Sequence, residues 1–161
     1  MRKLFVLCAA ATMAIPSVLS ADMAPRDVVF GELGEVETPL TDTPGNPEAG
    51  FTAATERGIG NCVACHTAEG WADMPFPGNV GPVLTGIANV YDEATLRGIL
   101  VNSKKAFPGT VMPAFYNLDD IYRPGDGYTG KAATEEVTVL TAQQVEDIVA
   151  LLKTFDEPLP E

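Results

Sequence analysis

Basic residues are scarce in this sequence of 161 residues. Ten Lys and Arg stand against 22 Asp and Glu, which gives a formal net charge of −12. A surface of this sign repels phosphate groups, so nucleic acid is excluded as a partner. The charge either steers encounters with basic protein patches or simply keeps the protein soluble.

Long apolar runs are also missing. The longest spans residues 4–15, which is fewer than the ~20 residues that a helix needs to cross a bilayer. Two basic residues precede it and small residues follow it, as in a cleaved export signal. We therefore expect residues 1–21 to be removed after Ser20 or Ala21. The mature protein would lie in the periplasm without a permanent membrane anchor. Its net charge would be −14, because the signal carries two basic and no acidic residues.

Cysteine is limited to three residues, and Cys8 is lost with the signal. The other two form Cys62-Val-Ala-Cys65-His66, the haem-attachment pattern. In this pattern two thiols form thioethers with the haem vinyl groups, and the adjacent imidazole meets the iron. The spacing matches the separation of the vinyl groups and carries the histidine under the metal. The sequence therefore predicts one haem c, bound covalently at Cys62 and Cys65 and ligated by His66.

A cysteine pair can also belong to a zinc site, a thioredoxin-like redox site or a structural disulfide. A zinc site needs four ligands, and no further Cys or His exists beyond residue 66 or between the signal and Cys62. A thioredoxin-like pair follows a strand in a βαβ unit, and no such pattern is present. A structural disulfide between Cys62 and Cys65 stays open as an alternative.

The sixth iron ligand has to differ from histidine unless a partner chain donates one, because His66 is the only histidine. A methionine thioether is the usual exported alternative and raises the reduction potential. Three methionines follow the signal: Met23, Met74 and Met112. Lys104 and Lys105 are more remote fallback ligands.

Reach along the chain favours Met112. Met23 lies close to the expected signal cut. Met74 follows His66 by eight residues, which span ~27 Å only when fully extended and leave no slack for passing round a macrocycle. Met112 follows by 46 residues and has ample length. The alternative role for either methionine is packing against the haem edge.

With both axial positions filled by protein, the iron has no open site, and the chemistry reduces to electron transfer. We expect the Gly81-Pro82 turn to bring a carbonyl to the back of His66 and fix its ring. The other ionisable groups are expected on a solvated surface. Four aromatic residues are expected to form packing walls: Trp71, Phe76, Phe107 and Phe115.

The periodicity predicts a mainly helical domain. Residues 22–47 are rich in Pro and acidic residues and are predicted to form an extended arm. A helix is expected to begin at Asn46-Pro47 and to run through Ile59 up to the cysteine pair. A loop follows over residues 67–82, and a short helix is expected over residues 93–101.

The last helix has the clearest sequence pattern. Thr141 and Gln144 have capping-box spacing, and a loop over residues 102–138 precedes them. The apolar residues Val145, Ile148, Val149, Leu152 and Phe155 fall on one face. Pro158 is expected to end the helix. No strand pattern is stronger than the short run at residues 137–140.

Five segments, taken in order, resemble the SoxX family, the small cytochrome subunits of the SoxAX complex of thiosulfate oxidation. These are Leu40-Thr-Asp-Thr-Pro-Gly-Asn-Pro47, Gly60-Asn-Cys-Val-Ala-Cys-His66, Gly81-Pro-Val-Leu-Thr-Gly86, Thr110-Val-Met-Pro-Ala-Phe-Tyr116 and Leu140-Thr-Ala-Gln-Gln-Val-Glu-Asp-Ile-Val-Ala150. The likeness covers about residues 39–156. It departs at Asn46, where the family often has Asp, and over residues 117–139, which are longer and more acidic.

The resemblance implies an all-α, class I cytochrome c-like fold with crossing terminal helices around one covalently bound haem, and His and Met axial ligands. The domain is placed at residues 48–156, after the arm and before a tail at residues 157–161. It implies a partner, the larger cytochrome subunit SoxA, whose haem joins thiosulfate oxidatively to a carrier-protein cysteine. This chain would accept the electrons and pass them to a downstream acceptor cytochrome.

The resemblance thus implies a non-catalytic redox subunit of an L-cysteine S-thiosulfotransferase complex, rather than an enzyme alone. This fits the lack of a third cysteine to take part in sulfur chemistry. The alternative is a free, diffusible periplasmic cytochrome c that serves an oxidase or a dehydrogenase.

Overall fold

The computed structural model describes residues 22–119 and 137–158. The export signal predicted for residues 1–21 lies outside the described residues, as do residues 120–136 of the acidic segment and residues 159–161 of the tail.

Three α-helices make up the regular structure: α1 at Pro47–Thr55, α2 at Glu93–Ala106 and α3 at Ala142–Leu152. Four short 3-10 helices also occur: η1 at Pro25–Asp27 before α1, and η2 at Cys62–Ala64, η3 at Glu69–Trp71 and η4 at Ile87–Asn89 between α1 and α2. No strand occurs in the two described ranges. The all-α prediction is confirmed. None of the described helices combines the length and the apolar character that crossing a bilayer requires.

Helix α1 begins where the sequence predicts and ends earlier. Asn46 Oδ1 accepts hydrogen bonds from the backbone N–H of Glu48 at 2.9 Å and of Ala49 at 3.1 Å, so Asn46 is the N-cap. The prediction that the helix reaches the cysteine pair is wrong. Glu56 adopts an extended conformation with ψ 127°, and a turn follows in which Gly60 N–H donates to the Ala53 carbonyl at 2.9 Å. This turn redirects the chain before the motif.

Helix α2 begins at its N-cap Asp92, whose carboxylate accepts from Thr95 N–H at 2.8 Å. It runs five residues beyond the predicted end at Val101, to Ala106. Asn102 interrupts it with φ −152° and ψ 90°, values outside the helical region. The sequence pattern thus detected the part of the helix before the kink.

Helix α3 confirms the predicted capping box. Thr141 Oγ1 accepts from Gln144 N–H at 3.2 Å, while Gln144 Oε1 accepts from Thr141 N–H at 2.9 Å. All the predicted apolar face is buried: Val145, Ile148, Val149, Leu152 and Phe155. The expected end at Pro158 is wrong, because the helix ends at Leu152 and Thr154 N–H closes a turn onto the Leu151 carbonyl.

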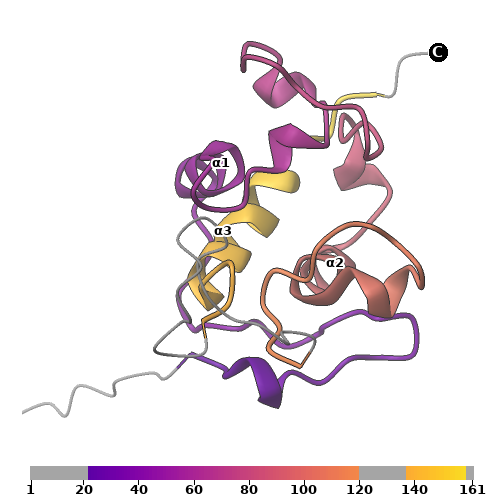
Figure 1. Cartoon of the computed structure of the whole chain (residues 1–161). Coiled ribbons are helices and arrows are strands. Elements are labelled where there is room, and N and C mark those ends of the chain that lie inside the picture. Colours follow the sequence, from indigo (N-terminus) through magenta and orange to yellow (C-terminus); the bar gives the residue numbers. More distant parts are fainter. Residues whose placement is uncertain (1–21, 120–136, 159–161) are drawn as a thin grey trace, which may run out of the picture.

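Helices α1 and α3 lie side by side (Figure 1), and α2 packs less extensively against α3. A glycine on α1 permits their close approach: a Cβ on Gly50 would lie 2.0 Å from the backbone oxygen of Asp147. Gly45, just before α1, meets the Glu146 backbone oxygen in the same way, at 2.2 Å. The two backbones therefore touch at positions where no side chain fits.

The N-terminal segment is part of the core. It runs without regular strands beneath α2 (Figure 1), and Val36 and Leu40 on it are each 1% exposed. Val36 N–H donates to the Ala94 carbonyl at 2.9 Å, and Met23 N–H to the Leu40 carbonyl at 2.8 Å. Composition predicted an extended segment, but these two apolar residues bury it against the helices.

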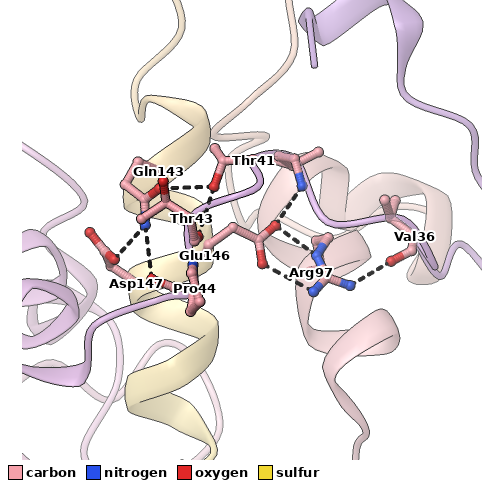
Figure 2. Close-up of polar contacts among 9 residues, drawn as sticks. Val36, Thr41, Thr43, Pro44, Arg97, Gln143, Glu146 and Asp147 are labelled. Atoms are coloured by element: carbon pink, nitrogen blue, oxygen red, sulfur yellow. Dashed lines mark hydrogen bonds and ion pairs between the residues drawn. The ribbon is translucent and has the colours of Figure 1, made fainter. Parts of the chain in front are cut away.

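A buried ion pair joins α2 to α3. Arg97 binds Glu146 in bidentate fashion, with Nε–Oε1 at 2.8 Å and Nη2–Oε2 at 3.0 Å, and both side chains are almost fully buried. The pair also holds the N-terminal segment, because Leu40 N–H donates to Glu146 Oε1 and Arg97 Nη1 donates to the Val36 carbonyl, each at 2.8 Å (Figure 2). The expectation that the charged groups form a solvated surface is wrong here.

Asp147 extends this arrangement to the start of α1. Its Oδ1 accepts from Asn46 N–H at 2.8 Å and from Gln143 Nε2 at 2.9 Å. Gln143 Oε1 in turn accepts from Thr41 Oγ1 at 2.8 Å (Figure 2). We call the side chains of Thr41, Arg97, Gln143, Glu146 and Asp147 the polar network. It fixes three segments that are far apart in sequence.

Candidate metal centre

The cysteine motif folds into one tight turn. Asn61 opens it in the left-handed region with φ 49°, and η2 follows. The backbone N–H groups of Cys65 and His66 both donate to the Cys62 carbonyl, at 3.0 and 2.9 Å. The turn therefore gathers two free thiols and an imidazole within five residues.

The Cys62 thiol is neutral at physiological pH. Burial raises its pKa to about 11, and the neighbouring Cys65 adds to the rise, while a backbone hydrogen bond opposes it. Cys62 packs against the hydrophobic core. The neutral Cys62 side chain is therefore an apolar group that can pack against a planar apolar ligand.

The His66 ring is held by the segment over residues 78–84. Nδ1 lies 2.7 Å from the Pro82 carbonyl oxygen, which makes Nδ1 the protonated nitrogen and leaves the lone pair of Nε2 for a metal. Gly81 lies against the ring, because a Cβ there would stand 2.3 Å from His66 Cε1. Gly81 N–H donates to the Cys65 carbonyl at 2.8 Å, which fixes this approach.

Met74 belongs to a segment that folds back on the motif. Between His66 and Met74 the chain forms η3, and Met74 N–H closes a turn onto the Trp71 carbonyl at 3.0 Å. Beyond Met74, Gly78 N–H returns to the Val63 carbonyl at 2.8 Å. The eight residues after His66 are therefore not extended. The distance that they span is shorter than the fully extended length, which already left no slack for Met74 to pass round the macrocycle.

Met112 lies on a separate segment, which follows α2. Its side chain is partly buried and packs against the core. Its backbone is held on both sides: N–H donates to Thr110 Oγ1 at 3.2 Å, and the carbonyl accepts from Ser103 Oγ at 2.8 Å and from Lys104 Nζ at 2.6 Å. Met23, the third candidate, is also partly buried, and its carbonyl accepts from the Tyr116 hydroxyl.

The Cytochrome c family model matches residues 48–156 of this chain, more than half of its length. The chain belongs to the cytochrome c family. It is also similar to a chain in the crystal structure of SoxXA from P. pantotrophus, with 49% identity and a TM-score of 0.80. The alignment covers 85% of this chain and 100% of that chain. No curated protein matches it.

The cofactor of this cytochrome c is a single covalently bound haem c. The residues present fit it: two free thiols stand at CxxCH spacing, and the imidazole beside them offers Nε2. No group of three or more His, Cys, Asp and Glu side chains arranged to hold a bare metal ion occurs in the described part of the chain.

The aromatic residues divide into two pairs. Trp71 and Phe115 are buried, and Trp71 meets Phe155 edge to face with ring centroids 5.3 Å apart. Phe76 is 89% exposed and Phe107 is 43% exposed. Trp71 and Phe115 therefore pack in the protein core of this cytochrome c, and packing against the haem stays a prediction for Phe76 and Phe107.

Two groups of interacting residues have no signal in the sequence. Ser103 and Lys104 hold the Met112 carbonyl, but Lys104 stood out only as a remote ligand. Arg97 and Glu146, which form an ion pair, are 49 positions apart in the sequence. Taken alone, each is an ordinary charged residue of a predicted helix. Only the packing of α2 on α3 in this cytochrome c brings them together.

Proposed function

We propose that this cytochrome c is the electron-accepting subunit of a SoxXA-like complex. In such a complex, joining thiosulfate to a carrier-protein cysteine releases electrons, and this chain takes them up. The likeness to the SoxXA chain carries the proposal, because it extends over all of that chain at 49% identity and includes the haem motif. The haem supplies a one-electron couple between ferric and ferrous iron.

The proposed centre uses five residues of this chain. Cys62 and Cys65 hold the haem through thioethers, and His66 and Met112 are the axial ligands. Pro82 fixes the His66 ring through its carbonyl, which would leave Nε2 to bind the metal. With both axial positions occupied by protein, a substrate has no site on the iron, and the chain transfers electrons without catalysing the sulfur chemistry itself.

Two uncharged segments support docking against a partner near this centre. Residues 74–91 and 106–118 contain no Asp, Glu, Lys or Arg, although the whole chain carries 32 such residues. The first segment includes Pro82, and the second includes Met112. Both expose large apolar side chains: Phe76 at 89%, Val80 at 68%, Val83 at 55% and Val111 at 82%. Exposed apolar groups of this kind suit an apolar partner surface. We assign this partner surface to the larger, SoxA-like cytochrome subunit.

The proposal places the mature protein in the periplasm, after removal of residues 1–21 and without a membrane anchor. Residues 22–47 form the arm, residues 48–156 the cytochrome domain and residues 157–161 a tail. A downstream cytochrome receives the electrons. The alternative is a free, diffusible cytochrome, which the acidic composition favours, since acidic surfaces steer encounters with basic partners.

The ligand assignment is tested with Met112→Ala and Met74→Ala variants of the haem-loaded protein. The near-infrared methionine-to-iron band should disappear in the Met112 variant and persist in the Met74 variant. Loss of the band in the Met74 variant alone would contradict the assignment.

The partner assignment is tested by co-purification with the larger cytochrome subunit encoded in the same organism. A stable complex is expected, and Phe76→Ser should weaken it. Leu33→Ser is the matched control, because Leu33 is 82% exposed but lies outside both uncharged segments. A strictly monomeric native protein, with thiosulfate turnover surviving its deletion, would favour the free cytochrome.

A further inference from the structure

The kink in α2 opens the end of this helix toward the segment that carries Met112. At the kink Lys104 N–H donates to Asn102 Oδ1 at 3.2 Å. The Leu100 carbonyl accepts from Phe115 N–H at 3.1 Å. The neighbouring Val101 carbonyl likewise accepts from Tyr116 N–H at 3.2 Å. The chain leaving Met112 is thus bound to the carbonyls of the kinked turn.

Two side chains directly after the kink converge on the Met112 carbonyl. Ser103 is fully buried, and its hydroxyl donates to this oxygen at 2.8 Å, with a longer contact of 3.4 Å to the Pro113 carbonyl. Lys104 donates to the same oxygen from its ammonium group at 2.6 Å. A carbonyl has two lone pairs, so these two donors fill its capacity. One of the bonds is charge-assisted and therefore stronger than a neutral bond.

We propose that Ser103 and Lys104 are positioning residues for the sixth ligand: they hold the Met112 backbone so that its sulfur stays on the iron. The proposal rests on the assignment of Met112 made above. A ligand whose backbone is held by two donors loses little further freedom when it binds, and an incoming ligand must displace it against both bonds. Lys104 adds a positive charge at this oxygen. A nearby cation favours the less positive, ferrous state and so raises the reduction potential.

Lys105 provides a matched control within the same turn. It carries the same charge one position further along the chain, and its ammonium group lies 5.8 Å from the centroid of the Phe30 ring. The bond to the Met112 carbonyl belongs to Lys104. Both lysines are exposed, so neither substitution disturbs the core.

The test uses the haem-loaded variants Ser103→Ala, Lys104→Gln, Lys104→Arg and Lys105→Gln. Three readouts are followed: the near-infrared methionine-to-iron band, the reduction potential, and the affinity of the ferric protein for added imidazole, which competes with the methionine. Ser103→Ala and Lys104→Gln should each raise the imidazole affinity about tenfold, the effect of losing one such bond. Lys104→Gln should also lower the reduction potential. Lys104→Arg should restore both properties, and Lys105→Gln should leave the imidazole affinity unchanged.

The inference is overturned if Ser103→Ala and Lys104→Gln keep the parent imidazole affinity while Met112→Ala loses the band. In that case the ligand assignment stands and only the positioning role fails. A band that persists in Met112→Ala overturns both. Equal lowering of the potential by Lys104→Gln and Lys105→Gln would refute a specific charge effect of Lys104. If Ser103→Ala does not fold, the Lys104 variants decide the question alone, because that side chain is exposed.

Discussion

The polar network and the haem motif are stabilised in different ways. The network joins side chains from segments distant in sequence, such as Arg97 with Glu146, and buries them. Around the motif, over residues 61–84, the bonds run mostly between backbone groups near one another in sequence, such as Gly81 with Cys65. The polar network therefore uses its side chains to hold distant segments together. The haem motif is held mainly by its backbone, so its side chains stay available for a cofactor.

The largest effect is expected from breaking the network. Glu146→Ala leaves the Arg97 guanidinium buried without its carboxylate and removes the acceptor of Leu40 N–H. Loss of one member of a buried pair should lower the free energy of unfolding by about 3–5 kcal/mol. Denaturant titration of the haem-loaded protein measures this. The visible spectrum of the folded fraction should stay unchanged.

An exposed ion pair serves as the control. Arg26 Nε and Asp119 Oδ1 are 3.9 Å apart, with both side chains more than half exposed, so Asp119→Asn should change stability by less than about 1 kcal/mol. The double replacement Arg97→Met with Glu146→Leu should cost less than Glu146→Ala alone, because no buried charge is left unpaired. A larger loss in the double variant would argue against this account.

A smaller loss of stability, this time together with a changed haem spectrum, is expected from a substitution at the haem motif. Gly81→Ala introduces a Cβ 2.3 Å from His66 Cε1, so the ring has to move. Such overpacking costs about 1–3 kcal/mol of stability. The diagnostic result is a changed visible spectrum and a shifted reduction potential. Gly58→Ala, where nothing lies within 4 Å of the added Cβ, should leave both unchanged. Identical spectra for the two variants would show that Gly81 does not constrain the histidine.

The smallest effect is expected at the start of α3. Thr141→Ala removes the hydroxyl that accepts from Gln144 N–H and should lower the free energy of unfolding by about 1 kcal/mol. Thr141→Ser keeps the acceptor and should restore most of the loss. Thermal unfolding followed by circular dichroism distinguishes the two. A loss as large as that of Glu146→Ala would mean that the cap contributes to the network.

The sequence correctly predicted the helix caps, which form between residues close together in the chain. The capping box of α3 and the Asn46 N-cap of α1 involve residues three or fewer positions apart, and both predictions are confirmed. The end of α1 was misplaced because the amphipathic pattern continues through Ile59 although the backbone turns at Glu56. Gly58 and Gly60 were the available signals for that turn.

Contacts between segments far apart in the sequence could not be predicted in the same way. Val36 and Leu40 are isolated apolar residues in an acidic, proline-rich segment, and only contact with the helices shows that they belong to the core. Phe76 adopts φ 57° and is exposed on a segment without charges, and the sequence carries no signal for this backbone conformation.

The candidate site residues and the Pro82 carbonyl behind His66 were predicted from the motif, the Gly-Pro turn and chain length. The contacts of Ser103 and Lys104 with the Met112 carbonyl depend on tertiary structure.

The polar network also sets an order of events during folding. Glu146 belongs to the last helix, and it binds both Arg97 and the backbone of Leu40, which is 106 residues away. Contacts of such sequence separation form slowly, because a long loop has to close first. A chain emerging from its N-terminus therefore completes Cys62-Val-Ala-Cys65-His66 long before the network can close around the first segment. The two thiols are therefore present in the emerging chain before the residues of the last helix that close the network.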